Sequence, residues 1–306
     1  MIEKYYNGVI EQVAGGIGNV EHNSILVRYS NDFSIWDLES VNHYKDQTDI
    51  FFTCHEFSYN KIAEAYEPYL GLIRQMFHKY CSGTLEEFME ECDVYKLQRP
   101  VFESYFEKGF CERTEQILID EVEYEQERMH SSIVTMLQKL SEICPIVIVL
   151  NRFQLASKST MQLTNRLLQT KNKNIGIVLG VNDVQSIPEF AHEEWDAICE
   201  SMDDRNMVYH IGNAGRNMEP DVMDYYSDYE SDDGYRKLNN LVYFLDFDQA
   251  DHHLSKIERR IKFDNFTISE KKHYQLLLLQ IMVSVLQRDI AKALESCEDL
   301  EKLQDQ

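Results

Sequence analysis

The sequence lacks an excess of basic residues. Its 306 residues include 53 acidic residues and 30 lysines and arginines, which gives a formal net charge of −23 at neutral pH. Nucleic-acid binders need a basic surface to neutralise phosphates, and an anionic membrane surface repels so acidic a chain. We therefore expect no nucleic-acid partner and no membrane partner. A protein partner attracted by charge would be basic.

The sequence also lacks the patterns of disulfide-bonded, metal-binding, secreted and membrane-spanning proteins. Its seven cysteines are irregularly spaced and form no C-x-x-C pair, so we expect reduced thiols and a cytoplasmic location. The N-terminus has no apolar run of the signal-peptide kind. The longest apolar stretch, 276–286, contains Gln280 and Ser284 and is too short to span a bilayer. It predicts a buried helix.

Strand and helix patterns alternate through the first two thirds of the chain. Short apolar runs separated by segments of helical periodicity predict five strands. We expect them at 24–29, 49–54, 146–150, 174–180 and 207–211. Such alternation is typical of an α/β fold with a parallel sheet covered by helices on both faces.

Helical periodicity predicts the connecting helices. We expect them at 1–13, 59–80, 85–92, 100–109, 114–143 and 188–202, with a further one after the strand 146–150. Pro68 is expected to kink the second of these helices. Thr84 and Glu87 form a capping box for the third, and Ser157 or Ser159 is the expected N-cap of the helix after the strand 146–150.

The phosphate loop of a P-loop ATPase is missing where it would be needed. The window from Ser30 to Trp36 follows the first strand but contains neither glycine nor lysine. A phosphate loop requires a glycine-rich backbone that cradles phosphates and a lysine that reaches them. Gly15, Gly16 and Gly18 precede the strand instead of following it, so they predict a flexible connection.

The sequence of the last part of the chain predicts helical hairpins. Residues 216–234 are strongly acidic and predict a solvated linker. Beyond them, the segment 246–250 lines up with 289–293, and each segment follows an apolar helix and ends in alanine. A helix, a tight turn and a second helix that starts with a small residue are typical of tetratricopeptide-like hairpins. Two hairpins are fewer than such arrays need, so either the native protein continues beyond Gln306 or the hairpins pack on the sheet domain.

The segment IVIVLNRFQLAS, residues 146–157, resembles the second conserved motif of the STAND class of P-loop ATPases, a signalling branch of the AAA superfamily. In that motif a hydrophobic strand is followed by two acids, an apolar residue and His-Trp-Ala-Asp. Asn151 and Arg152 stand where the two acids belong, and Gln154 stands at the histidine. Asn182, at the end of the next strand, matches the polar sensor position of the family. The resemblance implies an ATPase architecture without the acids that hold magnesium.

The resemblance implies a degenerate P-loop NTPase-like core followed by tetratricopeptide-like helices, as in bacterial signalling proteins with a diguanylate cyclase or transcriptional-regulator output domain. The expected domains are an N-terminal helix with its glycine-rich connection (1–20), the core (21–215), the acidic linker (216–234) and the hairpins (235–306). The expected function is a non-catalytic regulatory or scaffold region without a cofactor. It would bind a protein partner through its hairpins, with an output domain following in a longer protein.

Two alternatives remain open at this point. A STAND-type nucleotide-binding switch would bind ATP and magnesium through non-standard residues. Arg28, Arg152 and Lys158 would then face the phosphates, with Asn151 and Asn182 beside them. The third possibility is an unrelated enzyme, for which the sequence offers no nucleophile, base and acid in a recognisable arrangement.

Overall fold

The structure is a computed structural model that describes residues 2–18, 23–30, 35–45, 47, 49–58, 61–111, 122–170, 172–183, 187–203, 207–211, 229, 231–264 and 266–304. The chain divides into two compact units. The first consists of 1–59, 66–93 and 132–223, and the second of 60–65, 94–131 and 224–306. None of the described helices combines the length and the apolar character needed to cross a membrane.

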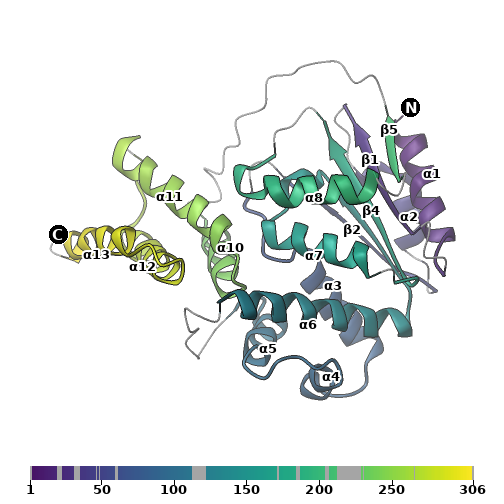
Figure 1. Cartoon of the computed structure of the whole chain (residues 1–306), viewed down its shortest axis with the longest axis horizontal. Helices are drawn as coiled ribbons and strands as arrows, with labels where there is room; N and C mark the ends of the chain where they lie inside the picture. The colour runs from purple at the N-terminus through teal and green to yellow at the C-terminus, as the bar shows by residue number, and fades with distance from the viewer. Residues whose placement is uncertain are drawn as a thin grey trace. The chain divides into compact units, whose positions relative to one another are not determined.

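A five-stranded, all-parallel sheet forms the centre of the first unit (Figure 1). Its strands lie in the order β2-β3-β4-β1-β5, and they are β1 Ser24–Tyr29, β2 Phe51–Glu56, β3 Ile146–Asn151, β4 Ile175–Asn182 and β5 Val208–Ile211. β3 and β4 are buried along their whole length, as continuous apolar strands in a covered parallel sheet should be. The α/β class and the parallel sheet are confirmed, although β2 begins two residues later than expected.

Helices cover both faces of this sheet. α1 (Ile2–Gly15) and α2 (Glu39–Lys45) share one hydrophobic cluster with β1, which includes Tyr6, Ile10 and Val41. α7 (Lys158–Gln169) and α8 (His192–Asp203) lie on the other side (Figure 1). Right-handed crossovers explain this division, because the chain crosses the sheet one way from β1 to β2 and the opposite way from β2 onward.

The helix expected over 59–80 begins only at Tyr69, as α3 (Tyr69–Tyr80). Pro68 is its N-cap residue, and Tyr66, two residues before it, has a left-handed backbone with φ of 57°. Proline has no N–H to donate and keeps the residue before it out of the helical region. The first half of that prediction was therefore wrong, because Pro68 starts the helix instead of kinking it.

The other predicted helices agree better with the structure. They are α4 (Leu85–Glu91), α5 (Arg99–Lys108), α6 (Val122–Ile143), α7 and α8, the last preceded by the 3₁₀ turn η4 (Glu189–Ala191). The capping box at the start of α4 is confirmed, because Thr84 and Glu87 each bond the backbone N–H of the other. The expected beginning of α6, from residue 114, lies outside the described residues.

The second unit contains two helical hairpins at the C-terminal end of the chain (Figure 1). They consist of α10 (Asp232–Tyr243), α11 (Phe247–Phe263), α12 (Glu270–Leu286) and α13 (Ile290–Gln304). α10 starts three residues before the expected boundary, because Ser231 caps it by accepting a hydrogen bond from the Gly234 N–H at 2.8 Å. Most of the acidic segment 216–234 lies outside the described residues, so its role as a linker stays a prediction.

The two hairpins turn in the same way. Leu245 and Arg288 both have left-handed backbones, with φ of 69° and 64°. The same two backbone bonds form in each turn: Asp246 N–H to Leu241 O and Asp289 N–H to Ser284 O at 2.8 Å, and Leu245 N–H to Val242 O and Arg288 N–H to Val285 O at 3.1 Å. This pair of bonds is the Schellman motif that ends many helices. The internal repeat predicted from the sequence is confirmed at these two turns.

A polar network joins three separate segments of the second unit. Arg236 of α10 makes a bidentate contact with Glu64, whose carboxylate oxygens lie 2.5 and 3.4 Å from its guanidinium nitrogens. Arg236 also donates to the carbonyl of Gly109 at 2.9 Å, and Asn240 accepts from the Cys111 N–H at 3.0 Å. Residues 60–65 and 94–131 thus belong to the same unit as the hairpins, which the expected division into 21–215 and 235–306 did not include.

Candidate functional site

The carboxyl ends of β1 and β4 form the switch point of the sheet. The chain leaves β1 toward one edge of the sheet and leaves β4 toward the other. Ligands of open α/β sheets bind in the crevice at such a point. Tyr29 and Asn182 end these two strands and are partners in the β1–β4 register. This edge is therefore the place where a nucleotide site would be built.

The five residues predicted for nucleotide binding are distributed along this edge. Arg28 and Asn182 belong to the ends of β1 and β4. Asn151 ends the neighbouring β3, and Arg152 follows it with a left-handed backbone, φ 52°. Lys158 is the first residue of α7. The fold therefore places all five at the carboxyl side of three adjacent strands.

Each of the three cations in this set lies beside a carboxylate. The pairs are Arg28 Nε with Asp183 Oδ1 at 2.7 Å, Arg152 Nη1 with Glu56 Oε1 at 3.3 Å, and Lys158 Nζ with Glu194 Oε1 at 3.5 Å. Both side chains of the Arg152–Glu56 pair are largely buried, with 17 % and 13 % of their surface exposed. A phosphate at any of these cations would have to compete with a carboxylate that is already in place.

The two amides of the set are engaged inside the protein. Asn151 is fully buried, and its Oδ1 accepts a hydrogen bond from Tyr29 Oη at 2.7 Å. Asn182 is 3 % exposed, and its carbonyl accepts from Gln154 Nε2 at 3.2 Å. Gln154 therefore joins the loop after β3 to the end of β4. The Asn151 side chain thus connects β3 to β1 across β4, whereas Asn182 is bonded to Gln154 through its backbone.

Side chains of Tyr6 and Asn151 fill the space beside Gly180 of β4. A Cβ atom added at Gly180 would meet Tyr6 Oη and would lie 2.6 Å from Asn151 Oδ1. Burial, with smaller contributions from Tyr29, Glu56 and Cys54, raises the pKa of Tyr6 well above 10, so this phenol stays neutral. Tyr6 and Tyr29 were not among the residues singled out from the sequence, because tyrosines within apolar segments look like ordinary core residues.

The hydroxyl groups next to Lys158 serve the start of α7. Ser157 Oγ accepts from the Thr160 N–H at 3.1 Å and donates to Thr160 Oγ1 at 2.7 Å. Ser159 Oγ accepts from the Tyr66 N–H at 3.3 Å. Ser157 is therefore the N-cap, one of the two expected, and its bonds leave no geometry that would pair it with Lys158 as a nucleophile.

A group of three carboxylates lies between α11 and α13. Glu258, Glu295 and Asp299 each offer an oxygen close enough to the others to hold a metal ion. Lys262 Nζ already lies among them, at 2.8, 3.2 and 2.8 Å from these oxygens. Burial lowers the pKa of Lys262, but bonds to Asp299, Glu258 and Glu295 outweigh it and raise the pKa above its usual value. The lysine therefore supplies the positive charge that this cluster needs.

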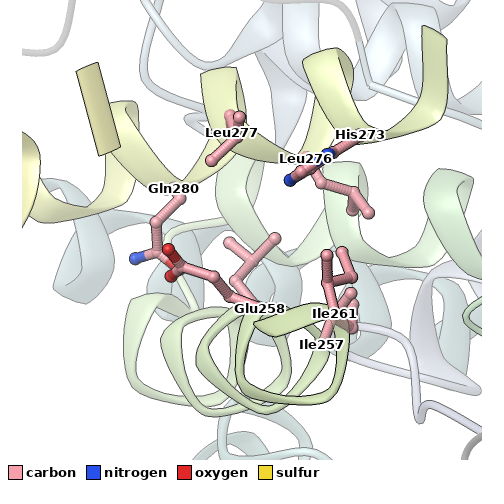
Figure 2. Close-up of a pocket in the computed structure, with 8 residues that line it drawn as sticks. Ile257, Glu258, Ile261, His273, Leu276, Leu277 and Gln280 are labelled. Atoms are coloured by element: carbon pink, nitrogen blue, oxygen red, sulfur yellow. The ribbon is translucent and has the colours of Figure 1, made fainter. Parts of the chain in front are cut away.

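A small pocket lies between α11 and α12 (Figure 2). Ile257 and Ile261 line it from α11, and Leu276 and Leu277 line it from α12. Its volume of about 10 Å³ holds roughly one water molecule. Gln280 Oε1 is buried and accepts no hydrogen bond from the described residues, so such a water would have a partner there. The pocket is too small for an organic ligand.

The α12–α13 hairpin exposes large apolar side chains. α12 carries apolar residues on every side, although only one side of it is buried against its neighbours. Tyr274 and Leu278 of α12 are 37 % and 44 % exposed, and Ile290 and Leu294 of α13 are 57 % and 60 % exposed. We call these four residues the outer face. Exposed apolar patches of this kind mark protein interaction sites.

Comparisons with known proteins do not identify this chain. No family model matches the sequence, and neither the curated proteins nor the solved structures contain a significant match. Two surfaces of the molecule bear on its function, the sheet edge and the outer face.

Proposed function

We propose that this protein is a non-catalytic regulatory or scaffold region of a bacterial cytoplasmic signalling protein, and that it binds a protein partner through its C-terminal hairpins. In this proposal the sheet unit is a degenerate P-loop NTPase-like domain of the STAND class, and the hairpins are tetratricopeptide-like. An output domain would follow in the longer protein. The observation that carries the proposal is a contrast between two surfaces. At the sheet edge each predicted cation lies beside a carboxylate and Asn151 Oδ1 is bonded, whereas large apolar groups on the outer face stand exposed.

The chemistry of the sheet edge supports a scaffold over an ATPase. In this proposal Asn151 and Gln154 replace residues that would act on magnesium and water. Asn151 now bonds Tyr29 of β1, and Gln154 bonds the backbone of Asn182 at the end of β4. Arg28, Arg152 and Lys158 each lie beside an acid of the same unit. A fold persists after its site is lost, because core packing and site chemistry depend on different residues.

The hairpins support a partner-binding role. Their matching turns repeat one supersecondary unit, and arrays of such units present extended surfaces to partners. The outer face exposes four large apolar side chains on two adjacent helices. Burying such groups against a partner removes apolar surface from water, at about 25 cal/mol per Å².

A comparison of three forms of the full chain tests this function. Tagged wild-type protein, Leu278→Glu/Leu294→Glu and Arg28→Ala would each be used to capture proteins from the source cytoplasm, with quantification by mass spectrometry. We expect a protein that the wild type and Arg28→Ala retain equally and that the outer-face variant loses. A partner retained by the outer-face variant and lost by Arg28→Ala would contradict the proposal.

The nucleotide-binding switch is a second proposal, favoured by the position of Asn182, Arg28 and Lys158 near the switch point of the sheet. Calorimetric titration of MgATP and MgADP into the full chain separates the two. The scaffold proposal predicts no binding heat at concentrations that detect a micromolar Kd. Saturable binding that Arg152→Ala and Lys158→Ala abolish would establish the switch instead.

A further inference from the structure

We propose that the outer face binds a basic amphipathic helix, in which an apolar stripe is followed by lysines or arginines. This inference rests on the proposed function and specifies the chemistry of the partner. It combines three observations. They are the direction in which the outer face points, its place in the helical repeat, and two acidic residues at one end of it.

The outer face points away from α11. α12 contacts α11 through Leu276, Leu277 and Gln280, which line the pocket between the two helices (Figure 2). Tyr274 and Leu278 are four residues apart, so they share one side of α12. Their exposure shows that this side is not the one covered by α11.

The exposed apolar side of α13 also points away from α11. Its contacts with α11 come from three residues on one side: Lys292 Nζ lies 2.6 Å from Asp251 Oδ1, and Glu295 and Asp299 lie 3.2 and 2.8 Å from Lys262 Nζ. Ile290 and Leu294, again four residues apart, occupy another side and are more than half exposed. The four apolar side chains therefore belong to the surface of the second hairpin that faces away from the first.

The repeat indicates what kind of structure fits on this surface. Leu254, Ile257 and Ile261 of α11 lie beneath α12 and line the contact between the two hairpins. Helical arrays bury a continuous core because each hairpin covers the one before it. Within the described part of the chain, no hairpin covers the second one in this way, since its outer face remains exposed. A helix is the element that packs against such a face.

The acidic residues at one end of the outer face favour a basic helix as the partner. Glu298 and Glu301 continue the line of Ile290 and Leu294 along α13, four and seven residues beyond Leu294. Both are exposed, and neither forms an ion pair with another described residue. Lys302 on the same helix is already paired with Asp299 at 2.8 Å. The charge of Glu298 also acts on Lys302, but neither Glu298 nor Glu301 is held in an ion pair with a described residue. These two exposed carboxylates attract lysine or arginine and set the direction of the bound helix.

A second copy of this chain is a poorer occupant. Two copies that met through the same surface would bring Glu298 and Glu301 of both into one symmetric interface. Each copy also carries a net charge of −23, which opposes association at low salt. The charge of the surface therefore favours a different, basic partner.

Two synthetic peptides test the inference on the full chain. Both carry leucines at i, i+4, i+7 and i+11 of an otherwise identical helical sequence, and they differ only in a last turn of three lysines or three glutamates. Binding is followed by the fluorescence anisotropy of a label on the peptide. We expect the lysine peptide to bind roughly five- to tenfold more tightly than the glutamate peptide, with the difference shrinking as salt is added.

Substitutions on the protein locate the effect. Glu298→Lys/Glu301→Lys should reverse the preference between the peptides, and Leu278→Glu/Leu294→Glu should abolish binding of both. Glu86→Lys/Glu91→Lys changes the net charge equally at exposed acids of α4 and should leave the preference as in the wild type. Circular dichroism of each variant confirms that its helices are retained.

Several outcomes would overturn the inference. It fails if neither peptide binds, if both bind equally, or if the α4 control reverses the preference as well as the outer-face variant does. It also fails if sedimentation shows a dimer that Leu278→Glu/Leu294→Glu dissociates, because a second copy would then be the occupant. A cellular partner lost on Leu278→Glu/Leu294→Glu but indifferent to Glu298→Lys/Glu301→Lys would overturn the inference and leave the proposed function standing.

Discussion

Leu245 and Arg288 adopt the same left-handed backbone at the same position of two hairpin turns that lie 43 residues apart. Glycine is the usual residue at this position after a helix, because it has no Cβ to clash. Leu245 is 1 % exposed, so burial of its side chain offsets the backbone strain. Arg288 is exposed. Burial of the side chain therefore offsets less of the backbone strain in the second turn than in the first.

We expect Arg288→Gly to stabilise the protein by about 0.5–1 kcal/mol, because glycine adopts the left-handed backbone without strain. Arg288→Val should destabilise it by about 1–2 kcal/mol, because a β-branched residue fits this conformation poorly. Urea unfolding of the full chain, followed by circular dichroism, measures both. Equal effects of the two substitutions would show that the backbone conformation at position 288 does not cause the changes in stability.

The ion pair between Arg236 and Glu64 should matter more than surface pairs. Glu64 is 9 % exposed, and Arg236→Met would leave its carboxylate buried without its cation. We expect a loss of about 2–4 kcal/mol, because an unpaired buried charge is costly. Lys302→Met removes a cation whose side chain is 68 % exposed and should cost far less stability than Arg236→Met. Similar losses in the two variants would argue against this difference.

Gly180 is required by the close approach of Tyr6 and Asn151 to β4. Gly180→Ala should destabilise the protein by about 1–3 kcal/mol, because buried side chains would have to move. Gly71 lies inside α3, where an added Cβ meets nothing within 4 Å. Gly71→Ala should therefore stabilise the protein by up to about 1 kcal/mol. Thermal unfolding of the two variants shows whether each substitution changes stability in the expected direction. If Gly180→Ala left stability unchanged, the space beside Gly180 would be larger than described.

His253 should make stability depend on pH. Burial, and to a lesser extent the charges of His252 and Lys256, lower the pKa of this residue well below 6.5, and its Nδ1 lies 3.1 Å from Tyr229 Oη. In the unfolded chain the same imidazole takes up a proton as the pH falls through about 6.5, whereas in the folded chain it stays neutral to lower pH. The unfolded state then binds more protons, so the stability of the fold decreases as the pH falls below about 6.5.

His253→Gln should reduce this loss of stability between about pH 7 and pH 5, although it lowers stability at neutral pH. His78→Gln, at an exposed position of α3, serves as the control and should retain the pH dependence of the wild type. Unfolding free energies at several pH values in this range provide the measurement. The interpretation fails if His253→Gln and His78→Gln show the same slope.

Much of the fold could be predicted because the signals for it are local. β3 and β4 are continuous apolar segments, and the capping box of Thr84 and Glu87 spans only four residues. The start of α3 at Pro68 was not predicted, because helical periodicity continues on both sides of the proline. Periodicity reports which face of an element is apolar, and it carries less information about where the element begins.

The contacts that define the site and the two units could not be predicted in the same way. Glu64 and Arg236 are 172 positions apart, and no pattern near either residue indicates the other. The sequence singled out Asn151, but its partner Tyr29 lies 122 positions away and looks like a core residue. The pairing of Arg28 with Asp183 likewise depends on two strands that become neighbours only in the folded sheet.

The equivalence of the two hairpin turns has a consequence for how such a gene can change in length. Duplication of the segment from Asp246 to Arg288 would join Arg288 to a new Asp246, and this junction has the same backbone bonds as the existing ones. The protein could thus gain a complete pair of helices without a new kind of turn. The hairpin after the added helices would still be the one that carries Leu278 and Leu294, so a longer descendant would keep the outer face.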